Sequence, residues 1–189
     1  ARKLRLVVDN PPAALALYEA RRRGAEKLAW VELDEGVGVS LVTGGALYHT
    51  ENGHEGEVGH LQVPSCTEPC GCGSTGCLET QLRPSALVAE LRRRAGESRE
   101  GLLYYLAGRE LERIDFELVV RASEEGDEAV NAFLRERLKL LHLLLRVLIL
   151  VADPPALVLS GRLVRLTSIL GETLAEFKAL NRTSRLASL

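Results

Sequence analysis

The sequence predicts an α/β fold, and two patterns support this expectation. Residues 27–50 hold three short segments rich in β-branched residues and separated by turns, which is typical of an antiparallel sheet. Residues 156–179 have the pattern of a strand, a Ser-Gly turn and a helix. Helical periodicity dominates the segments between these two regions. The chain is therefore expected to pack helices against a small sheet.

Composition excludes several classes of protein. Of the 189 residues, 46% are hydrophobic and 26% are charged, as in ordinary globular proteins, and the net charge of −2 gives no electrostatic footprint for nucleic acid. The longest apolar run, residues 140–152, is interrupted by His142 and Arg146 and is too short to span a bilayer. The N-terminus does not resemble a signal peptide. We therefore expect a cytoplasmic protein without membrane association.

The first elements follow in order along the chain. Residues 5–9 form a short apolar run and predict a buried strand. Prolines 11 and 12 suit a helix entry, and residues 13–23, rich in Ala, Leu and Arg, predict the helix, which ends at Gly24. A three-stranded meander is then expected, with a Gly-Gly hairpin turn before its last strand. Its strands are predicted over residues 27–33, 37–43 and 46–50.

The second half of the chain is expected to be mainly helical. The longest predicted helix is apolar on almost every face after Leu140, which indicates burial between layers or in a subunit interface. His142 on this helix is expected to be a packed residue. No element is predicted for the polar residues 180–189. Helices are predicted over residues 84–94, 101–108, 116–122, 127–151 and 164–179.

Between the sheet and the helices lies a loop, residues 56–79, that carries metal-binding side chains. One imidazole and three thiolates are typical of a closed tetrahedral zinc site with a structural role. Glycines 71, 73 and 76 allow a tight backbone because glycine tolerates positive φ. Residues 64–76 lack hydrophobic periodicity, so metal binding would order them. The predicted ligands are His60, Cys70, Cys72 and Cys77.

Three alternatives compete with this zinc site. The cysteines could form disulfides, although a Cys-x-Cys pair is too close to bridge easily and an oxidising compartment is not indicated. They could also be unrelated thiols, although all of them fall within twelve positions. Finally, Cys66 could replace His60 and give a site with four thiolates.

The Gly-Glu-Val-Gly-His segment at 56–60, followed after nine residues by Cys-Gly-Cys-Gly-Ser-Thr-Gly-Cys-Leu-Glu at 70–79, resembles the signature of the ROK family of repressors and sugar kinases. The resemblance implies an actin-like, ribonuclease H-like sugar kinase fold, mainly its C-terminal lobe, with an inserted zinc loop. Carboxylates and an imidazole on a stiff loop suit sugar hydroxyls, because charged acceptors form strong hydrogen bonds. The resemblance also implies zinc on His60, Cys70, Cys72 and Cys77, and a sugar contacted by Asn10, Glu57, His60 and Glu79.

The residues expected of a kinase are altered. In ROK kinases an Asn-Asp pair precedes the first helix and its aspartate is the general base. Counting back from Glu19, Asn10 matches the asparagine and Pro11 matches the aspartate, and proline accepts no proton. If the chain is a kinase, Asp9, two positions away, is the remaining candidate for the catalytic base.

The expected ATP contacts also depart from the family. Residues 34–40, Asp-Glu-Gly-Val-Gly-Val-Ser, stand where the family has a Gly-Thr-Gly-x-Gly-Gly-Gly phosphate loop. Carboxylates at this loop would repel phosphate, and we expect Asp34 and Glu35 to form a solvated turn. Arg162 adds bulk at the second turn that contacts nucleotide in the family. ATP and Mg²⁺ are therefore not expected as cofactors.

These features predict the effector-binding and oligomerisation domain of a ROK-type transcriptional regulator. The expected partners are a sugar or sugar phosphate, further copies of the chain in a dimer or tetramer, and DNA only through a helix-turn-helix domain absent from this chain. Residues 1–189 are expected to form one domain without the family's N-terminal lobe. Two alternatives are a fragment of an ATP-dependent hexose kinase and a zinc-stabilised interaction domain without a ligand. A zinc enzyme is disfavoured, because four protein ligands leave no open coordination position.

Overall fold

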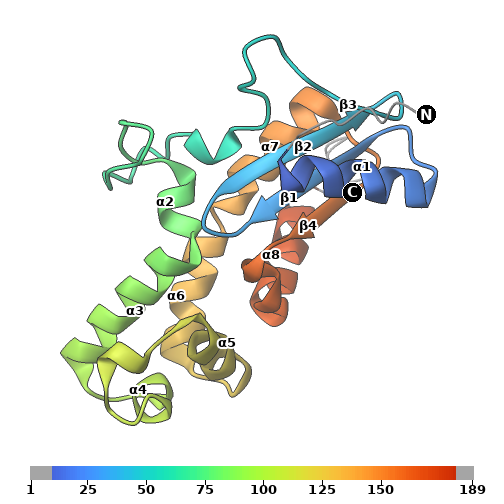
Figure 1. The fold of residues 1–189 in the computed structure, drawn as a ribbon. Helices are drawn as coiled ribbons and strands as arrows, with labels where there is room; N and C mark the ends of the chain where they lie inside the picture. The colour runs from blue at the N-terminus through green and yellow to red at the C-terminus, as the bar shows by residue number, and fades with distance from the viewer. Residues whose placement is uncertain (1–9, 182–189) are drawn as a thin grey trace, which may run out of the picture.

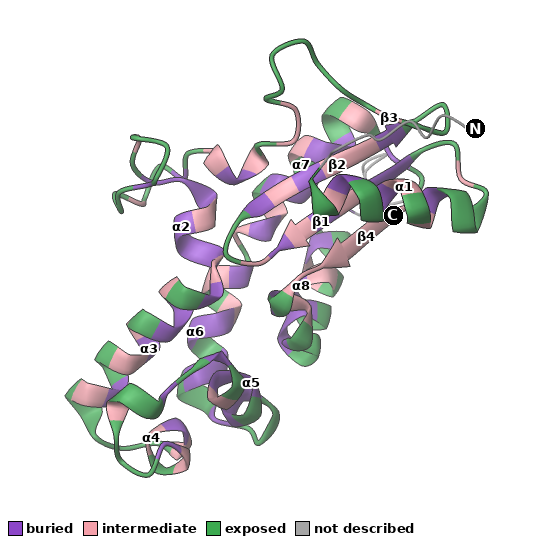
Figure 2. Ribbon diagram, in the orientation of Figure 1, coloured by how far each residue is buried: buried purple, intermediate pink, exposed green. Residues whose placement is uncertain are grey.

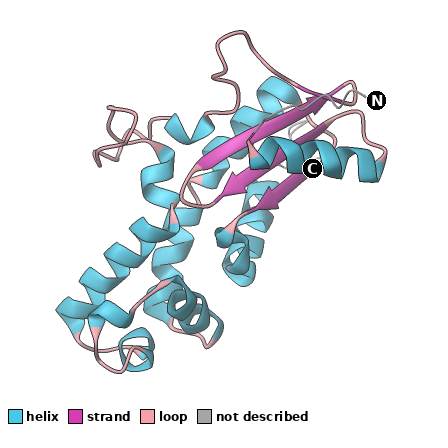
Figure 3. Ribbon diagram, viewed as in Figure 1, coloured by secondary structure: helices cyan, strands magenta, loops and turns pink. Residues whose placement is uncertain are grey.

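The computed structural model describes residues 10–181, so the strand expected over residues 5–9, and Asp9 with it, lie outside the described part. Within that part, a four-stranded sheet has the order β3-β2-β1-β4 (Figures 1 and 3). The expected meander is confirmed, although its last strand stops at residue 47 rather than 50. The antiparallel strands are β1 (Leu28–Leu33), β2 (Val37–Thr43) and β3 (Ala46–Leu47), and β4 (Leu157–Ser160) pairs parallel to β1.

Helix α1 (Pro11–Arg23) crosses one face of this sheet (Figure 1). It begins where the Asn10 side chain accepts a hydrogen bond from the Ala13 amide at 2.8 Å, and it ends at Gly24 with φ of 63°. Small buried residues on α1, Ala16 and Ala20, allow the helix to lie close to the sheet. The cap places Asn10 at the end of α1 that borders the cavity described below.

The opposite face of the sheet belongs to the main hydrophobic core. Val31 and Leu33 of β1 join this core, whereas Leu28 packs under α1, as the two-residue period of a strand requires. Helices α7 (Leu141–Ala152) and α8 (Thr167–Leu180) cover this face. Figure 2 shows the buried residues concentrated along the surfaces that these elements share.

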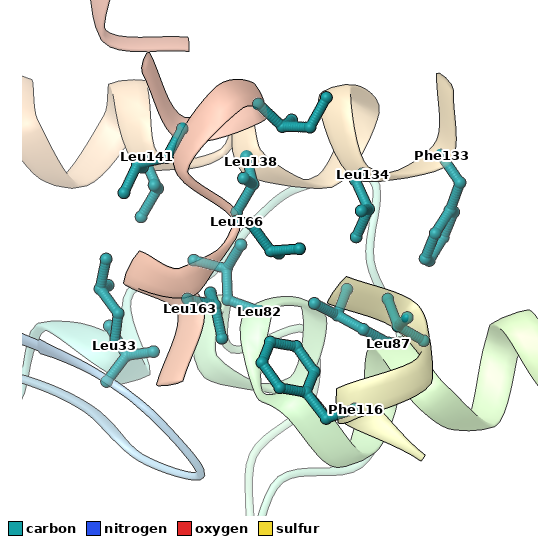
Figure 4. Close-up of a cluster of buried hydrophobic side chains, with 14 of the residues drawn as sticks. Leu33, Leu82, Leu87, Phe116, Phe133, Leu134, Leu138, Leu141, Leu163 and Leu166 are labelled. Atoms are coloured by element: carbon teal, nitrogen blue, oxygen red, sulfur yellow. The ribbon is translucent and has the colours of Figure 1, made fainter. Parts of the chain in front are cut away.

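The remaining helices form a unit beside the sheet, joined to it by a continuous core. In Figure 4, Leu163 and Leu166 near the start of α8 lie between Leu33 of β1 and the side chains of the helical unit. Phe133 and Leu134 extend the same cluster away from the sheet. The unit contains α3 (Pro84–Ser98), α4 (Leu102–Leu106), α5 (Phe116–Glu124) and α6 (Glu128–Leu138).

The single helix predicted over residues 127–151 is wrong in one respect, because the structure divides it into α6 and α7. Lys139 and Leu140 keep right-handed helical dihedral angles, but the hydrogen bonds here link residues three apart, such as the Leu140 amide with the Arg137 carbonyl at 3.1 Å. His142 is packed as expected, with Nε2 3.0 Å from the Thr173 carbonyl oxygen.

Other boundaries shift by a few residues. The last helix begins at Thr167, after a 3₁₀ turn over Arg162–Arg165, rather than at residue 164. Within the loop 56–79 the structure adds a 3₁₀ turn, Val58–His60, and a short helix, α2 (Leu78–Leu82), which the sequence did not indicate. None of the helices in the described residues is long and apolar enough to cross a membrane.

Candidate functional site

The predicted metal ligands converge in space. One ligand atom from each of His60, Cys70, Cys72 and Cys77 lies within 4.8 Å of every other. The Sγ atoms of Cys72 and Cys77 are 3.7 Å apart, and Cys70 Sγ lies 3.6 Å from His60 Nδ1. A tetrahedral zinc ion with Zn–S bonds of about 2.3 Å requires sulfur atoms about 3.8 Å apart. The cluster can therefore hold a metal ion of this kind with little rearrangement.

The loop backbone brings these ligands together through short-range hydrogen bonds. The amide of Val63 donates to the Gly76 carbonyl at 2.8 Å, and the amide of Gly76 donates to the Glu68 carbonyl at 2.9 Å. Gly73 and Gly76 have positive φ, and a Cβ at Gly76 would collide with the Cys66 carbonyl oxygen. Gly71 does not have positive φ, so the expectation for that glycine is wrong.

All cysteines are free thiols, so the disulfide alternative is not observed. Cys66 stands outside the cluster, which contains His60 instead. A backbone hydrogen bond at Cys72 lowers the pKa of the Cys70 thiol, but burial and hydrogen bonds with Glu79 and the neighbouring thiols outweigh it and raise that pKa to about 12. A metal would therefore have to displace the proton of Cys70, since thiolate is the form that binds metals.

His60 joins the metal cluster to a group of carboxylates. Its Nδ1 faces the sulfur of Cys70, whereas its Nε2 lies 3.5 Å from an oxygen of Glu57. The two ring nitrogens thus point in different directions, as a histidine that serves both a metal and a sugar requires. Glu79 is also close, with Oε1 3.2 Å from the Cys70 sulfur and 3.8 Å from His60 Nδ1.

Three of the four predicted sugar contacts, Asn10, Glu57 and Glu79, line one cavity of about 260 Å³. His60 does not line it and reaches it only through Glu57. The end of β1, the start of β2 and the turn at residue 56 form the walls of this cavity. Gly56 packs so closely against the Val39 carbonyl that a Cβ at this position would collide with it. The structure therefore groups most of the proposed sugar site around one hollow.

Asp34 also lines this cavity, together with two carboxylates that the sequence analysis did not single out. Glu32 lies on β1 and accepts a hydrogen bond from the hydroxyl of Ser160. Glu55 accepts a hydrogen bond from Thr50 at 2.7 Å, which, with a further bond from His49, lowers the pKa of Glu55 to about 2. A signal for Glu32 was available, because it is a charged residue within a strand whose other residues are hydrophobic and buried or partly buried.

Comparison with known proteins decides the family. The sequence pattern of the ROK family matches residues 3–183. The chain belongs to the ROK family. It is 43% identical over 82 residues to a glucokinase of Halalkalibacterium halodurans and 25% identical over 174 residues to the DNA-binding transcriptional dual regulator NagC of Escherichia coli. These alignments cover 41% and 89% of this chain, but only 25% and 41% of those proteins.

Solved ROK structures have the same fold. A glucokinase from Streptomyces griseus, solved with glucose and AMPPNP, superposes with a TM-score of 0.78 at 26% identity, over 90% of this chain and 58% of that one. A ROK transcriptional regulator homologous to E. coli MLC superposes with a TM-score of 0.76 at 22% identity, over 88% of this chain and 41% of that one, which shows the fold alone. The architecture is thus the actin-like α/β fold of ROK kinases and regulators.

In this ROK chain an ion-pair network occupies the turn between β1 and β2. Arg162 donates from Nε to Asp34 at 2.7 Å and from Nη2 to Glu35 at 2.7 Å, and its amide donates to Asp34 at 2.9 Å. Glu35 also accepts from the hydroxyl of Ser85 at 2.5 Å, at the start of α3. Asp34 and Glu35 lie in a partly exposed turn, as expected, but their ion pairs were not predicted. They connect the sheet, the turn after β4 and α3.

The Arg162 network is expected to make a moderate contribution to stability. Replacing Arg162 with glutamine should lower the free energy of unfolding by about 1 kcal/mol, because the groups are partly exposed but the contacts are multiple and charge-assisted. The hydrogen bond from Arg162 lowers the pKa of Asp34. The contribution should therefore be complete above pH of about 4 and fade as pH falls through the folded-state pKa. Urea unfolding of both proteins at several pH values measures this.

A double-mutant cycle separates the ion pair from other effects. Asp34→Asn and Arg162→Gln together should lower the free energy of unfolding by less than the sum of the two single losses, because each single change already breaks the Arg162–Asp34 pair. Additive losses of stability would contradict the network.

Proposed function

We propose that this chain is the sugar-sensing part of a cytoplasmic ROK transcriptional regulator, stiffened by a structural zinc ion and without phosphoryl transfer activity. Asn10, Glu57, His60 and Glu79 contact the sugar, and His60, Cys70, Cys72 and Cys77 hold the zinc. The observation that carries the proposal is that Asn10, Glu57 and Glu79 line a cavity directly beside the cluster of four side chains that can hold a metal ion. A glucokinase and the transcriptional regulator NagC are both among the relatives, which is consistent with such a site.

The arrangement supports sensing more than catalysis. Proline occupies position 11, where the family's kinases have the general base, and it forms the first turn of α1. Asp34 and Glu35 hold Arg162 at the two turns expected to contact ATP, so bound phosphate would have to displace an existing ion pair. A kinase needs both a base and a cradle for ATP and magnesium. The kinase remains the second candidate because a glucokinase is among the relatives.

Regulation would work through a shift between two packing arrangements of the helices. Zinc fixes the loop, and sugar bound at Glu57 and Glu79 favours one orientation of the helices that follow α2. These helices contribute to a homodimer or homotetramer, for which the exposed apolar residues Leu150 and Val151 of α7 are candidate contacts. DNA binding belongs to a helix-turn-helix domain elsewhere in the full protein.

The cavity also predicts which sugars bind. Five carboxylates line it, and among the described residues no lysine or arginine does. Negative lining disfavours anions, so an unphosphorylated sugar should bind more tightly than its 6-phosphate. The carboxylates are Glu32, Asp34, Glu55, Glu57 and Glu79.

One experiment tests the proposal. Calorimetry with glucose, N-acetylglucosamine and their 6-phosphates is combined with an ATP-consumption assay and with X-ray scattering. We expect an unphosphorylated sugar to bind and to change the shape or oligomeric state, and no ATP to be consumed. Sugar-dependent consumption of ATP would favour the kinase. Absence of binding by every sugar would favour a zinc-stabilised interaction domain.

A further inference from the structure

A second cavity, of about 370 Å³, lies among α2, α3 and α6 and has a different character. Thr80 and Gln81 of α2 form part of its wall, and Phe133 of α6 forms another part. These three helices lie next to one another in Figure 1. Glu79, the neighbour of Thr80, lines the sugar cavity instead. The two cavities therefore share α2 but have separate linings.

Arginines outnumber carboxylates in the charged lining of this cavity. Arg83, Arg93 and Arg137 face it together with Glu68 and Glu90. Both carboxylates already have partners. Glu90 accepts hydrogen bonds from Arg93 at 2.8 Å, which lower its pKa to about 2, and Glu68 accepts one from the Gln81 amide at 2.6 Å.

Two of the three arginines have no carboxylate partner in the part of the chain that the structure describes. Arg137 donates to the side-chain oxygen of Gln81, a neutral group, at 2.5 Å, and its guanidinium lies 5.3 Å from the centre of the Phe133 ring. The Nε–H of Arg83 is buried and has no hydrogen-bond partner among the described residues. Buried polar groups in folded proteins are almost always hydrogen-bonded, so this donor calls for an acceptor.

The local sequence explains why Arg83 stands here. Pro84 disfavours helical geometry in the residue before it, and Arg83 is extended with ψ of 138°. Helix α2 therefore ends and α3 begins at this residue, which places Arg83 in the angle between them. Since the break is fixed by proline and the flanking helices are packed in the core, the arginine is held in a defined position.

We propose that this cavity binds a small oxyanion, a phosphate or carboxylate group, held by Arg83 and Arg137. Guanidinium groups match the geometry of such anions and offer paired N–H donors. An oxyanion in the cavity would balance the charges of the two guanidinium groups, which have no carboxylate partner among the described residues. The site is distinct from the sugar cavity, whose lining is negative, and it does not depend on the proposed sugar function.

The test uses calorimetric titration of the whole chain with inorganic phosphate and, separately, with malonate, at ionic strength held constant with sodium chloride. At least one anion should bind saturably to the wild type. Arg83→Gln and Arg137→Gln should each weaken that binding at least about tenfold, the loss typical of one charge-assisted hydrogen bond. The anion that binds more tightly identifies the class of ligand.

The matched control is Arg121→Gln, which removes the same charge from α5, where Arg121 pairs with Glu125 at 2.7 Å away from the cavity lining. It should bind the anion as the wild type does. Arg137→Gln also loses its contact with Phe133, so Arg83→Gln, which removes no hydrogen bond, keeps the test valid if the other variant is unstable. Unchanged affinity in Arg83→Gln, or no binding beyond the chloride blank, would overturn the site.

Discussion

Replacing Cys72 with serine is expected to abolish metal binding and to unfold the loop of residues 56–79. The loop has few apolar contacts of its own between residues 64 and 76, so metal coordination takes the place of a hydrophobic core in holding these residues together. Structural zinc supplies on the order of 10 kcal/mol to small zinc-finger peptides. A third of that would lower the melting temperature of a domain of this size by about 10 °C. Elemental analysis and thermal unfolding measure both effects.

Cys66→Ser is the matched control for this experiment. It removes a thiol from the same loop, but Cys66 lies outside the cluster of possible ligands. The variant should retain one zinc ion per chain and nearly the wild-type melting temperature. Equal loss of metal in both variants would show that Cys66 belongs to the site. Wild-type protein that binds no zinc would refute the structural role of the metal.

The sheet and α1 could be predicted because local signals are strong there. Gly44 and Gly45 take the positive φ that a tight hairpin requires, and Gly24 ends α1 in the same way. The division of α6 from α7 could not be predicted, since Lys139 and Leu140 are neither proline nor glycine and both keep helical dihedral angles. Only the hydrogen-bond partners change at that point, and tertiary packing decides those.

The same distinction between local signals and tertiary packing applies to the candidate sites. The metal ligands lie within eighteen positions and their spacing is distinctive, so the sequence indicated them. The partners of Asp34 and Glu35 could not be found in this way, because Arg162 is 127 or 128 positions away and meets them only after β4 pairs with β1. The same holds for Arg83 and Arg137, which line one cavity although they are far apart in sequence.

His60 connects the two halves of the proposed mechanism. A metal on Nδ1 would fix the ring, and the fixed ring would present Nε2 to Glu57, whose side chain is 61% exposed. Metal binding and sugar binding should then be separable by mutation. A change at Cys72 disturbs both, whereas a change at Glu57 leaves the metal ligands intact.

Glu57→Gln is therefore expected to weaken sugar binding by about 10- to 100-fold, because it removes the charge from an acceptor of sugar hydroxyls worth about 1.5–3 kcal/mol. Glu57 belongs to the cavity lining and not to the metal cluster, so zinc content and melting temperature should stay near those of the wild type. Calorimetry with the best-binding sugar gives the affinity. Elemental analysis of the same sample confirms that the metal is retained.

Glu51→Gln provides the control for charge, since Glu51 is an exposed carboxylate of the same connection that does not line the sugar cavity. It removes one negative charge six positions from Glu57 and should leave the affinity unchanged. If both variants weaken binding equally, the effect is a general electrostatic one and Glu57 makes no direct contact. If Glu57→Gln loses zinc together with sugar, the carboxylate positions His60 in the metal site, and the sugar contact would have to be assigned to Glu79 and Asn10.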